Sequence, residues 1–262
     1  SSLLGSLLQV LKFNTDRRAE RVRVFELGRV FLRDASVANT DTTVQGYHQP
    51  MRVAGLAYGG VDLLQWGRKE HAVDFFDVKG DVEALLAPLS ARFEPAEHPA
   101  MHPGRCARVC LGERVIGHVG ELHPRWRQAW ELPQAPVLFE LELDAVLQRP
   151  VPRFAPVPKH QMVERDLAVV VAEAVTHGAI MGAIRAALPT ELLRDTVLFD
   201  VFRPQQGKGV QVGSAGLELG EKSLAVRLTL GGHAPLTEAD IDAAVQAVLA
   251  QLKAQVGARL RG

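Results

Sequence analysis

Two kinds of hydrophobic spacing follow each other along the first part of the chain. Five leucines near its start recur at the spacing of one helical face and predict an amphipathic helix: Leu3, Leu4, Leu7, Leu8 and Leu11. Segments rich in β-branched and aromatic residues then predict strands. These strands are expected at 22–31, 51–58 and 137–143, with a hairpin over 107–122 that turns at Gly112-Glu113. The pattern indicates a mixed α and β unit with a mainly antiparallel sheet.

Polar residues, helix caps and a proline indicate where the other elements of this part begin and end. Residues 34–50 are polar and turn-like. A helix is expected within 74–86, with Asp77 as its N-cap and an acidic first turn that suits the helix dipole. Pro124 is expected to open a short helix, because proline is tolerated in the first turn.

The part of the chain from about residue 157 onward has a simpler pattern. An almost continuous apolar run predicts a first strand, and alternating positions predict two more. Thr176 and Thr237 are expected to cap two helices, the second with Asp240 in a capping box, and Gly257 to end the second helix. The expected elements are a strand at 166–171, a helix at 177–187, strands at 192–202 and 223–230, a helix at 238–256 and a short strand at 258–260. This βαββαβ order predicts a ferredoxin-like fold, with both helices on one face of an antiparallel sheet.

The ferredoxin-like fold alone leaves the function open. An RNA-recognition motif needs aromatic residues on its central strands, and the segment 222–228 has none. A metal chaperone needs a C-x-x-C loop, and this part of the chain has no cysteine. A regulatory amino-acid-binding domain stays open as an alternative, with its ligand at the loop 174–178.

Four prolines within the segment RPVPRFAPVPK, residues 149–159, separate the two parts. Each proline fixes φ and removes an N–H donor, so the segment is expected to be extended, exposed and well ordered. The predicted organisation is an α+β chain with a first module at 1–148, a proline-rich linker at 149–158 and a second domain at 157–262. A stiff linker would lower the entropy cost of placing the second domain on a partner.

Composition narrows the possible function classes. The 262 residues carry a formal net charge of +0 and are 47% hydrophobic, which is ordinary for a globular protein and lacks the footprint of a strongly basic nucleic-acid binder. We find no apolar run long enough for a membrane span and no signal peptide. The two cysteines, Cys106 and Cys110, are expected to be buried free thiols, in agreement with the cytosol. The abrupt apolar start without Met indicates a fragment of a longer protein.

Several segments, in order, resemble the β subunit of bacterial phenylalanyl-tRNA synthetase. In the first part these are SLLGSLLQVLKFNTDR, VRVFELGRVF, DFFDVKGDVEALL and HPGRCARVCLGERVIGHVGELHP; in the second they are ERDLA, LFDVF and EKSLA. The resemblance implies a class II synthetase-like module that has lost its chemistry and packs against the catalytic α subunit. It also implies that a ferredoxin-fold anticodon-binding domain follows this module.

The same resemblance implies the partners and cofactors. The family joins phenylalanine to tRNA(Phe) with ATP and Mg²⁺, as a cytoplasmic tetramer of two α and two β subunits. We expect no cofactor and no catalytic residue in this fragment. Arg23 to Glu26 is similar to one arginine element of a class II site, but no G-x-G-x-x-R segment supplies the second arginine. Leu3, Leu4, Leu7 and Leu8 are candidates for the interface with the α subunit. A self-sufficient class II-like enzyme is the rival hypothesis.

Candidate tRNA contacts are cations for phosphates and planar or polar groups for bases. They are Arg165, Phe202, Arg203, Lys208, Lys222, Ser223 and Arg227. Structural roles compete with this interpretation: Arg165 can pair with Asp166, Arg227 can be a solvated strand residue, and Phe202 can lie in the core. Any phosphate contact makes binding sensitive to salt.

Three other features have plainer interpretations. The segment GLELGEKS, 216–223, is similar to a phosphate-binding loop but fails the spacing, so 203–221 is expected to be a hairpin extension. His98 and His102 lack a third ligand at a convincing spacing and are expected at the surface or in packing. The tryptophans, Trp66, Trp126 and Trp130, are expected in a core or an interface.

Overall fold

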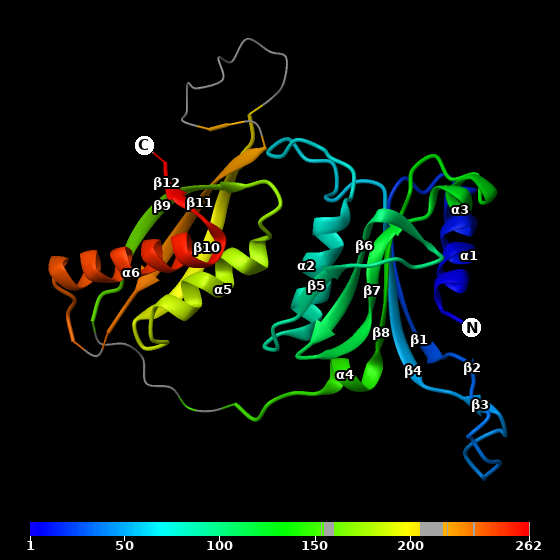
Figure 1. Cartoon of the computed structure of the whole chain (residues 1–262). Helices are drawn as coiled ribbons and strands as arrows, with labels where there is room; N and C mark the ends of the chain where they lie inside the picture. Colours follow the sequence, from blue (N-terminus) through cyan, green and yellow to red (C-terminus); the bar gives the residue numbers. More distant parts are fainter. Residues whose placement is uncertain (153, 155–159, 205–216, 219, 233, 262) are drawn as a thin grey trace. The chain divides into compact units, whose positions relative to one another are not determined.

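The chain divides into two compact units, unit 1 at residues 1–152 and unit 2 at residues 153–262. The computed structural model describes residues 1–152, 154, 160–204, 217–218, 220–232 and 234–261 (Figure 1). No helix among these residues is long and apolar enough to cross a membrane.

Unit 1 is built on a six-stranded antiparallel sheet with the order β1-β4-β8-β7-β6-β5. The strands are β1 (Val22–Arg29), β4 (Met51–Tyr58), β5 (Arg92–Pro95), β6 (Met101–Leu111), β7 (Arg114–Leu122) and β8 (Val137–Glu142). The hairpin of β6 and β7 turns at Gly112-Glu113 as predicted. β2 (Leu32–Arg33), just before the turn-like segment, and β3 (Tyr47–His48), within it, form a separate two-stranded ribbon.

Helix α1 (Leu4–Thr15) covers one face of this sheet. The predicted leucine face is buried against alternate residues of β4 and β8, such as Leu56 and Leu138. Four of these leucines were candidates for an interface with another subunit, but each is less than a tenth exposed: Leu3, Leu4, Leu7 and Leu8. They belong to the core of unit 1 instead. Each such leucine contributes about 1.5–3 kcal/mol to folding by leaving water.

Helices α2 (Phe75–Leu86) and α4 (Leu143–Leu147) cover the other face, where Val78, Val82 and Leu86 meet β4, β7 and β8. The predicted N-cap of α2 is wrong by three residues. Asp74 has extended backbone and accepts hydrogen bonds from the N–H groups of Phe76 and Asp77, while Asp77 accepts one from the N–H of Asp74. This capping box satisfies more N–H groups than a cap at Asp77 alone.

The short helix α3 (Pro124–Ala129) begins at Pro124 as predicted. The three tryptophans differ in environment. Trp130 packs against the core cluster that contains the leucines of α1, Trp126 is 40% exposed, and Trp66 is fully exposed in the loop between β4 and α2. A core position is therefore wrong for Trp66. Cys106 and Cys110 are buried free thiols, as predicted.

Unit 2 has the predicted βαββαβ order. Its sheet has the strand order β10-β11-β9-β12, made of β9 (Val163–Ala172), β10 (Leu193–Phe202), β11 (Glu221–Leu230) and β12 (Arg259–Leu260). Helices α5 (His177–Ala187) and α6 (Glu238–Val256) pack on one face (Figure 1). The side chains of Thr176 and Thr237 cap these helices, and Gly257 ends α6 with φ +65°. A left-handed residue at this place favours glycine.

The described part of the linker is exposed. Val151 is 84% and Phe154 93% exposed, and Arg149 donates a hydrogen bond to the carbonyl of Leu85 at 2.8 Å. Residues 153 and 155–159 lie outside the described residues, so the extended linker stays a prediction.

Candidate nucleic-acid interface

Helices α5 and α6 leave the opposite face of the sheet in unit 2 without a helical cover. We call this side of the sheet the open face. Because side chains alternate along a strand, burial of Leu167, Val169 and Val171 against the helices directs the residues between them to the open face. Cross-strand partners share a face, and the register adds the residues of the other strands. The open face comprises Glu164, Asp166, Ala168 and Val170 of β9; Ser223, Ala225, Arg227 and Thr229 of β11; and Val197, Asp200 and Phe202 of β10.

Arg227 lies at the centre of the open face between two carboxylates. Its Nε and Nη2 atoms donate to Asp166 Oδ1 at 2.8 Å and Oδ2 at 2.9 Å, and its Nη1 lies 3.1 Å from Glu164 Oε2. The two-pronged hydrogen bond to Asp166 fixes the guanidinium plane. It also raises the pKa of Arg227 and holds the pKa of the Asp166 carboxyl below its usual value. Arg227 is therefore more ordered than a freely solvated strand residue.

Two phenylalanines of β10 stand exposed beside arginines on this face. Phe199 is 53% exposed, and the Cζ of Arg227 lies 5.5 Å from its ring centre. Phe202 is 38% exposed and has the Cζ of Arg261 at the same distance. The core position considered for Phe202 is therefore wrong. These distances fit cation–π contacts, and both rings are available for stacking.

Phe199 was not predicted, and a β-bulge explains why. Residues three apart on a regular strand lie on opposite faces. The register of β10 shifts between Leu198 and Asp200, so Phe199 is an extra residue that turns toward the same side as Phe202. The aromatic groups therefore lie on β10, next to β11 where the sequence lacks them. The sequence shows that two phenylalanines lie close together in the segment LFDVF, but it does not show the bulge that brings them to one face.

Two of the predicted cations lie on the helix side of the sheet. Arg165 is opposite Leu228 and donates to Glu238 Oε2 at 2.9 Å, so the pairing with Asp166 that we considered is wrong. Lys222 is opposite Val171 and is only 8% exposed. Its Nζ donates to the carbonyl of Glu173 at 2.7 Å and lies 3.8 Å from that residue's carboxylate.

The remaining candidates are distributed near the end of β10. Ser223 lies on the open face but is 3% exposed, beside Phe202. Arg203 forms a salt bridge with Glu173 at 3.0 Å. Lys208 lies outside the described residues, as does most of the segment 203–221. Lys222 and Ser223 belong to strand β11 and not to the helix start that a phosphate-binding loop requires.

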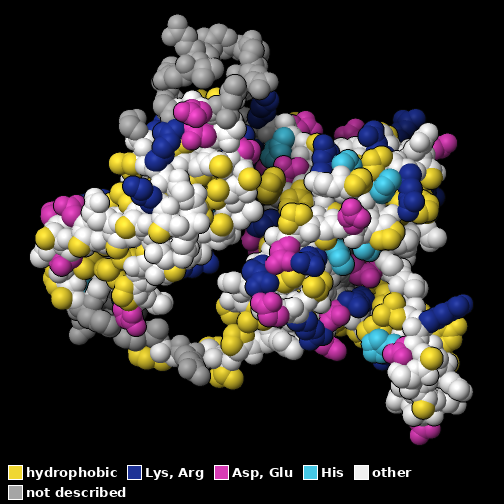
Figure 2. All heavy atoms as spheres, viewed as in Figure 1, with side chains coloured by type: hydrophobic (Ala, Val, Ile, Leu, Met, Phe, Trp, Pro, Cys, Tyr) yellow, Lys and Arg dark blue, Asp and Glu magenta, His cyan; other side chains and the backbone are white. Residues whose placement is uncertain are grey.

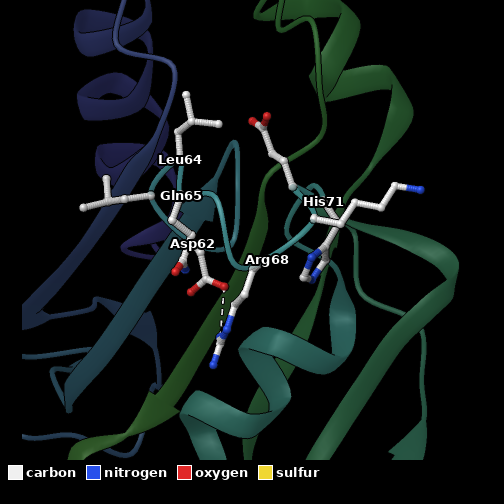
Figure 3. Close-up of a pocket in the computed structure, with 8 residues that line it drawn as sticks. Asp62, Leu64, Gln65, Arg68 and His71 are labelled. Carbon is white, nitrogen blue, oxygen red and sulfur yellow. Dashed lines mark hydrogen bonds and ion pairs between the residues drawn. The ribbon is translucent and has the colours of Figure 1, made fainter.

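In unit 1, the arginine of the segment that resembles one arginine element of a class II site is already paired with a carboxylate. Arg23 of β1 forms a salt bridge with Asp81 of α2 at 3.1 Å. The loop between β4 and α2 encloses a hollow of about 10 Å³, where Arg68 bonds to Asp62 (Figure 3). This volume is close to that of a single water and is far below that of a nucleotide pocket.

Two histidines of unit 1, His98 and His118, pack against each other, and the part of the chain that the structure describes holds no cluster of metal-ligating side chains. The rings of His98 and His118 lie 5.1 Å apart and are half-buried. Burial lowers the pKa of both imidazoles. These rings favour the neutral state and support a packing role.

A second hollow lies on unit 2, between the end of α5 and the start of β10. It has a volume of about 270 Å³ and is lined by Arg185, Leu188, Thr190, Leu193, Arg194, Asp195 and Thr196. The loop 174–178, which would bind the ligand in the alternative of a regulatory amino-acid-binding domain, does not line this hollow.

Comparison with known proteins gives one consistent result. The model of the phenylalanyl-tRNA synthetase beta chain CLM domain matches residues 1–143, and that of the ferredoxin-fold anticodon-binding domain matches 158–261. Similar relatives are the phenylalanine–tRNA ligase beta subunits of Cupriavidus pinatubonensis (49% identity), Burkholderia lata (50%) and Chromobacterium violaceum (45%). Each match covers the whole chain and 32%, 32% and 31% of the relative, respectively, so the chain spans about a third of their length. The chain therefore belongs to the phenylalanyl-tRNA synthetase beta chain family.

Proposed function

We propose that this chain serves as part of a phenylalanine–tRNA ligase β subunit and binds tRNA(Phe) through the open face of unit 2. The observation that carries the proposal is the pair of exposed rings, Phe199 and Phe202, each beside an arginine on a domain of the anticodon-binding family. Single-stranded RNA is recognised by stacking on such rings and planes, together with hydrogen bonds to base edges.

The open face divides into regions with different chemistry. Its centre holds the carboxylates of Glu164 and Asp166 around Arg227, and Asp200 and Phe202 follow on β10. Carboxylates repel phosphates but accept hydrogen bonds from the amino groups of bases. Phosphates are expected near Arg203 and Arg261 at the ends of their strands. Acidic and basic side chains stand next to one another on the surface seen in Figure 2. The chain has a formal net charge of +0, so the proposal relies on the local placement of cations on the open face and not on a broad basic field.

Unit 1 is proposed to pack against the catalytic α subunit of a cytoplasmic tetramer with two α and two β subunits. The leucines of α1 are buried, so exposed apolar side chains of the edge strand β1 replace them as candidates. Phe25 is 74% and Leu27 53% exposed, and both lie on the sheet face covered by α2. ATP and Mg²⁺ belong to the parent enzyme's synthesis of phenylalanyl-tRNA in this proposal.

Filter binding of tRNA(Phe) to the assembled enzyme tests the role of the open face. Phe202→Ala is expected to weaken binding by about 5- to 150-fold, which is the range for loss of one stacked base. Leu260→Ala removes another exposed apolar side chain, from β12, and serves as the control. Equal affinity of the Phe202→Ala enzyme and the wild type would exclude this surface.

Phenylalanine-dependent exchange of pyrophosphate into ATP separates the proposal from the rival enzyme hypothesis. The chain alone is expected to show no exchange, and addition of an α subunit with the rest of the β subunit is expected to restore it. Exchange by the chain alone would overturn the assignment of catalysis to the α subunit. Calorimetry with free phenylalanine tests the regulatory alternative, for which heat of binding to unit 2 would be required.

A further inference from the structure

Arg227 differs from an ordinary phosphate-binding arginine in the way its charge is already used. Two carboxylates, from Asp166 and Glu164, face this one guanidinium. Each of its three nitrogens contacts a carboxylate oxygen at 2.8–3.1 Å. A phosphate that approached this group would meet two negative charges within the same contact shell, which opposes its binding.

The same contacts leave the faces of the guanidinium plane available. Hydrogen bonds to Asp166 lie in that plane, so they hold the group flat without covering it. The ring of Phe199 lies 5.5 Å from the Cζ of Arg227. Both side chains remain substantially exposed, at 53% for the residue Phe199 and 45% for the side chain of Arg227. A planar ligand can therefore extend the contact between them.

We propose that Arg227 and Phe199 form a stacking platform for one unpaired base of the RNA, with Asp166 and Glu164 as positioning residues. This inference rests on the proposed function and specifies how the centre of the open face recognises RNA. Unpaired bases stack on aromatic rings and on arginine planes, and such stacking tolerates any base because every base has a π-face. The platform supplies affinity without neutralising a phosphate.

The charge on Arg227 and the shape of Arg227 make different predictions. Lysine keeps the charge but has no flat group to stack. If the platform operates, Arg227→Lys in the assembled enzyme weakens tRNA(Phe) binding by about 5- to 150-fold, and Phe199→Ala does the same. The slope of log affinity against log salt stays unchanged in both variants, because no phosphate contact is lost.

Arg261→Gln is the matched control, since Arg261 stands over Phe202 without a carboxylate partner among the described residues. Loss of one phosphate contact to a single strand lowers the salt slope by about 0.7. Full binding by Arg227→Lys, with a lower slope in Arg227→Gln, would show a phosphate contact and overturn the platform. Unchanged binding in Phe202→Ala and Arg261→Gln as well would instead refute the proposed function itself.

A second measurement avoids dependence on the folding of any one variant. Wild-type enzyme is titrated with tRNAs that lack one base at each successive position of the anticodon loop, and the series is repeated with Phe199→Ala. The platform predicts one position at which loss of the base weakens wild-type binding but adds nothing to the effect of Phe199→Ala. Additive losses at every position would overturn the platform.

Discussion

Lys222 presents the sharpest conflict between a sequence-based role and a structural one. It is a basic residue in the segment EKSLA and was predicted to contact tRNA. In the fold its side chain is one-tenth exposed, and its Nζ donates to the carbonyl of Glu173 at 2.7 Å. We predict that Lys222→Met destabilises unit 2 and leaves the salt dependence of tRNA binding unchanged.

The magnitude follows from what methionine keeps and what it removes. Methionine keeps an apolar stem of similar length, so the packing beside β9 is largely retained. It removes a charged, part-buried hydrogen bond to the carbonyl of Glu173, which costs about 1.5–3 kcal/mol. The ion pair with the half-exposed Glu173 carboxylate at 3.8 Å adds less than about 1 kcal/mol. The sum, about 1.5–4 kcal/mol, corresponds to a roughly 10- to 700-fold rise in the population of open states, at about 1.4 kcal/mol per tenfold.

Native-state hydrogen exchange followed by mass spectrometry is the suitable assay, because all three tryptophans lie in unit 1 and fluorescence would miss unit 2. Amides of β9 and β11 are expected to exchange faster in Lys222→Met, while those of unit 1 stay unchanged. Lys253→Met removes an exposed lysine from the last turn of α6 and should cost at most about 1 kcal/mol. Unchanged exchange in Lys222→Met, together with a lower salt slope for tRNA, would refute the structural role.

Three further predictions concern stability. Gly59→Ala should destabilise unit 1 far more than Gly104→Ala, as measured by tryptophan fluorescence during unfolding in urea. Both glycines have φ near +90°, but a Cβ at Gly59 would lie 2.0 Å from a backbone oxygen, whereas a Cβ at Gly104 would have no atom within 4 Å. Equal losses of stability in the two variants would contradict this steric argument. Burial lowers the pKa of His98 and His118, so as pH falls below the usual pKa of 6.5 the unfolded chain binds protons at these residues before the folded chain does. Unit 1 should therefore have its full stability above this pH and lose stability below it. A free energy of unfolding that does not change with pH in this range would contradict burial of neutral rings. Thr237→Ala should remove an N-cap worth roughly 1 kcal/mol, so amide hydrogens at the start of α6 should exchange faster. Unchanged exchange would show that Asp240 caps the helix alone.

Most of the architecture was predictable because local signals and the fold agree. The βαββαβ order follows from alternation in the strands and from caps at Thr176 and Thr237, which the structure confirms. The leucines of α1 also gave the correct helix. Their predicted place at a subunit interface was wrong. An apolar helix face has the same sequence pattern whether it packs against a sheet of its own chain or against a partner.

Boundaries decided by competition between neighbouring residues were harder. Asp74 and Asp77 are both good caps, and only the reciprocal hydrogen bonds of the folded backbone select Asp74. Trp66 shows the reverse limit. A tryptophan is usually buried, but the loop between β4 and α2 is held by backbone bonds such as Val61 N–H to the carbonyl of His71, and it leaves the indole in solvent.

The candidate site depended on strand parity, which a motif does not contain. Arg165 and Asp166 are neighbours in ERDLA, yet one bonds to a helix and the other holds Arg227 on the open face. Lys222 and Ser223 are divided in the same way. A family motif on a strand therefore combines residues that build the domain with residues that face its ligand, because successive side chains point to opposite sides.

The bulge between Leu198 and Asp200 is an exception to this alternation, and it creates the aromatic surface. Without it, Phe199 and Phe202 would lie on opposite faces, and one ring would point toward the helices. With it, both rings and two arginines share the open face. The proposed RNA-binding surface of this chain of zero formal net charge therefore depends on the geometry of β10 more than on the number of basic residues in unit 2.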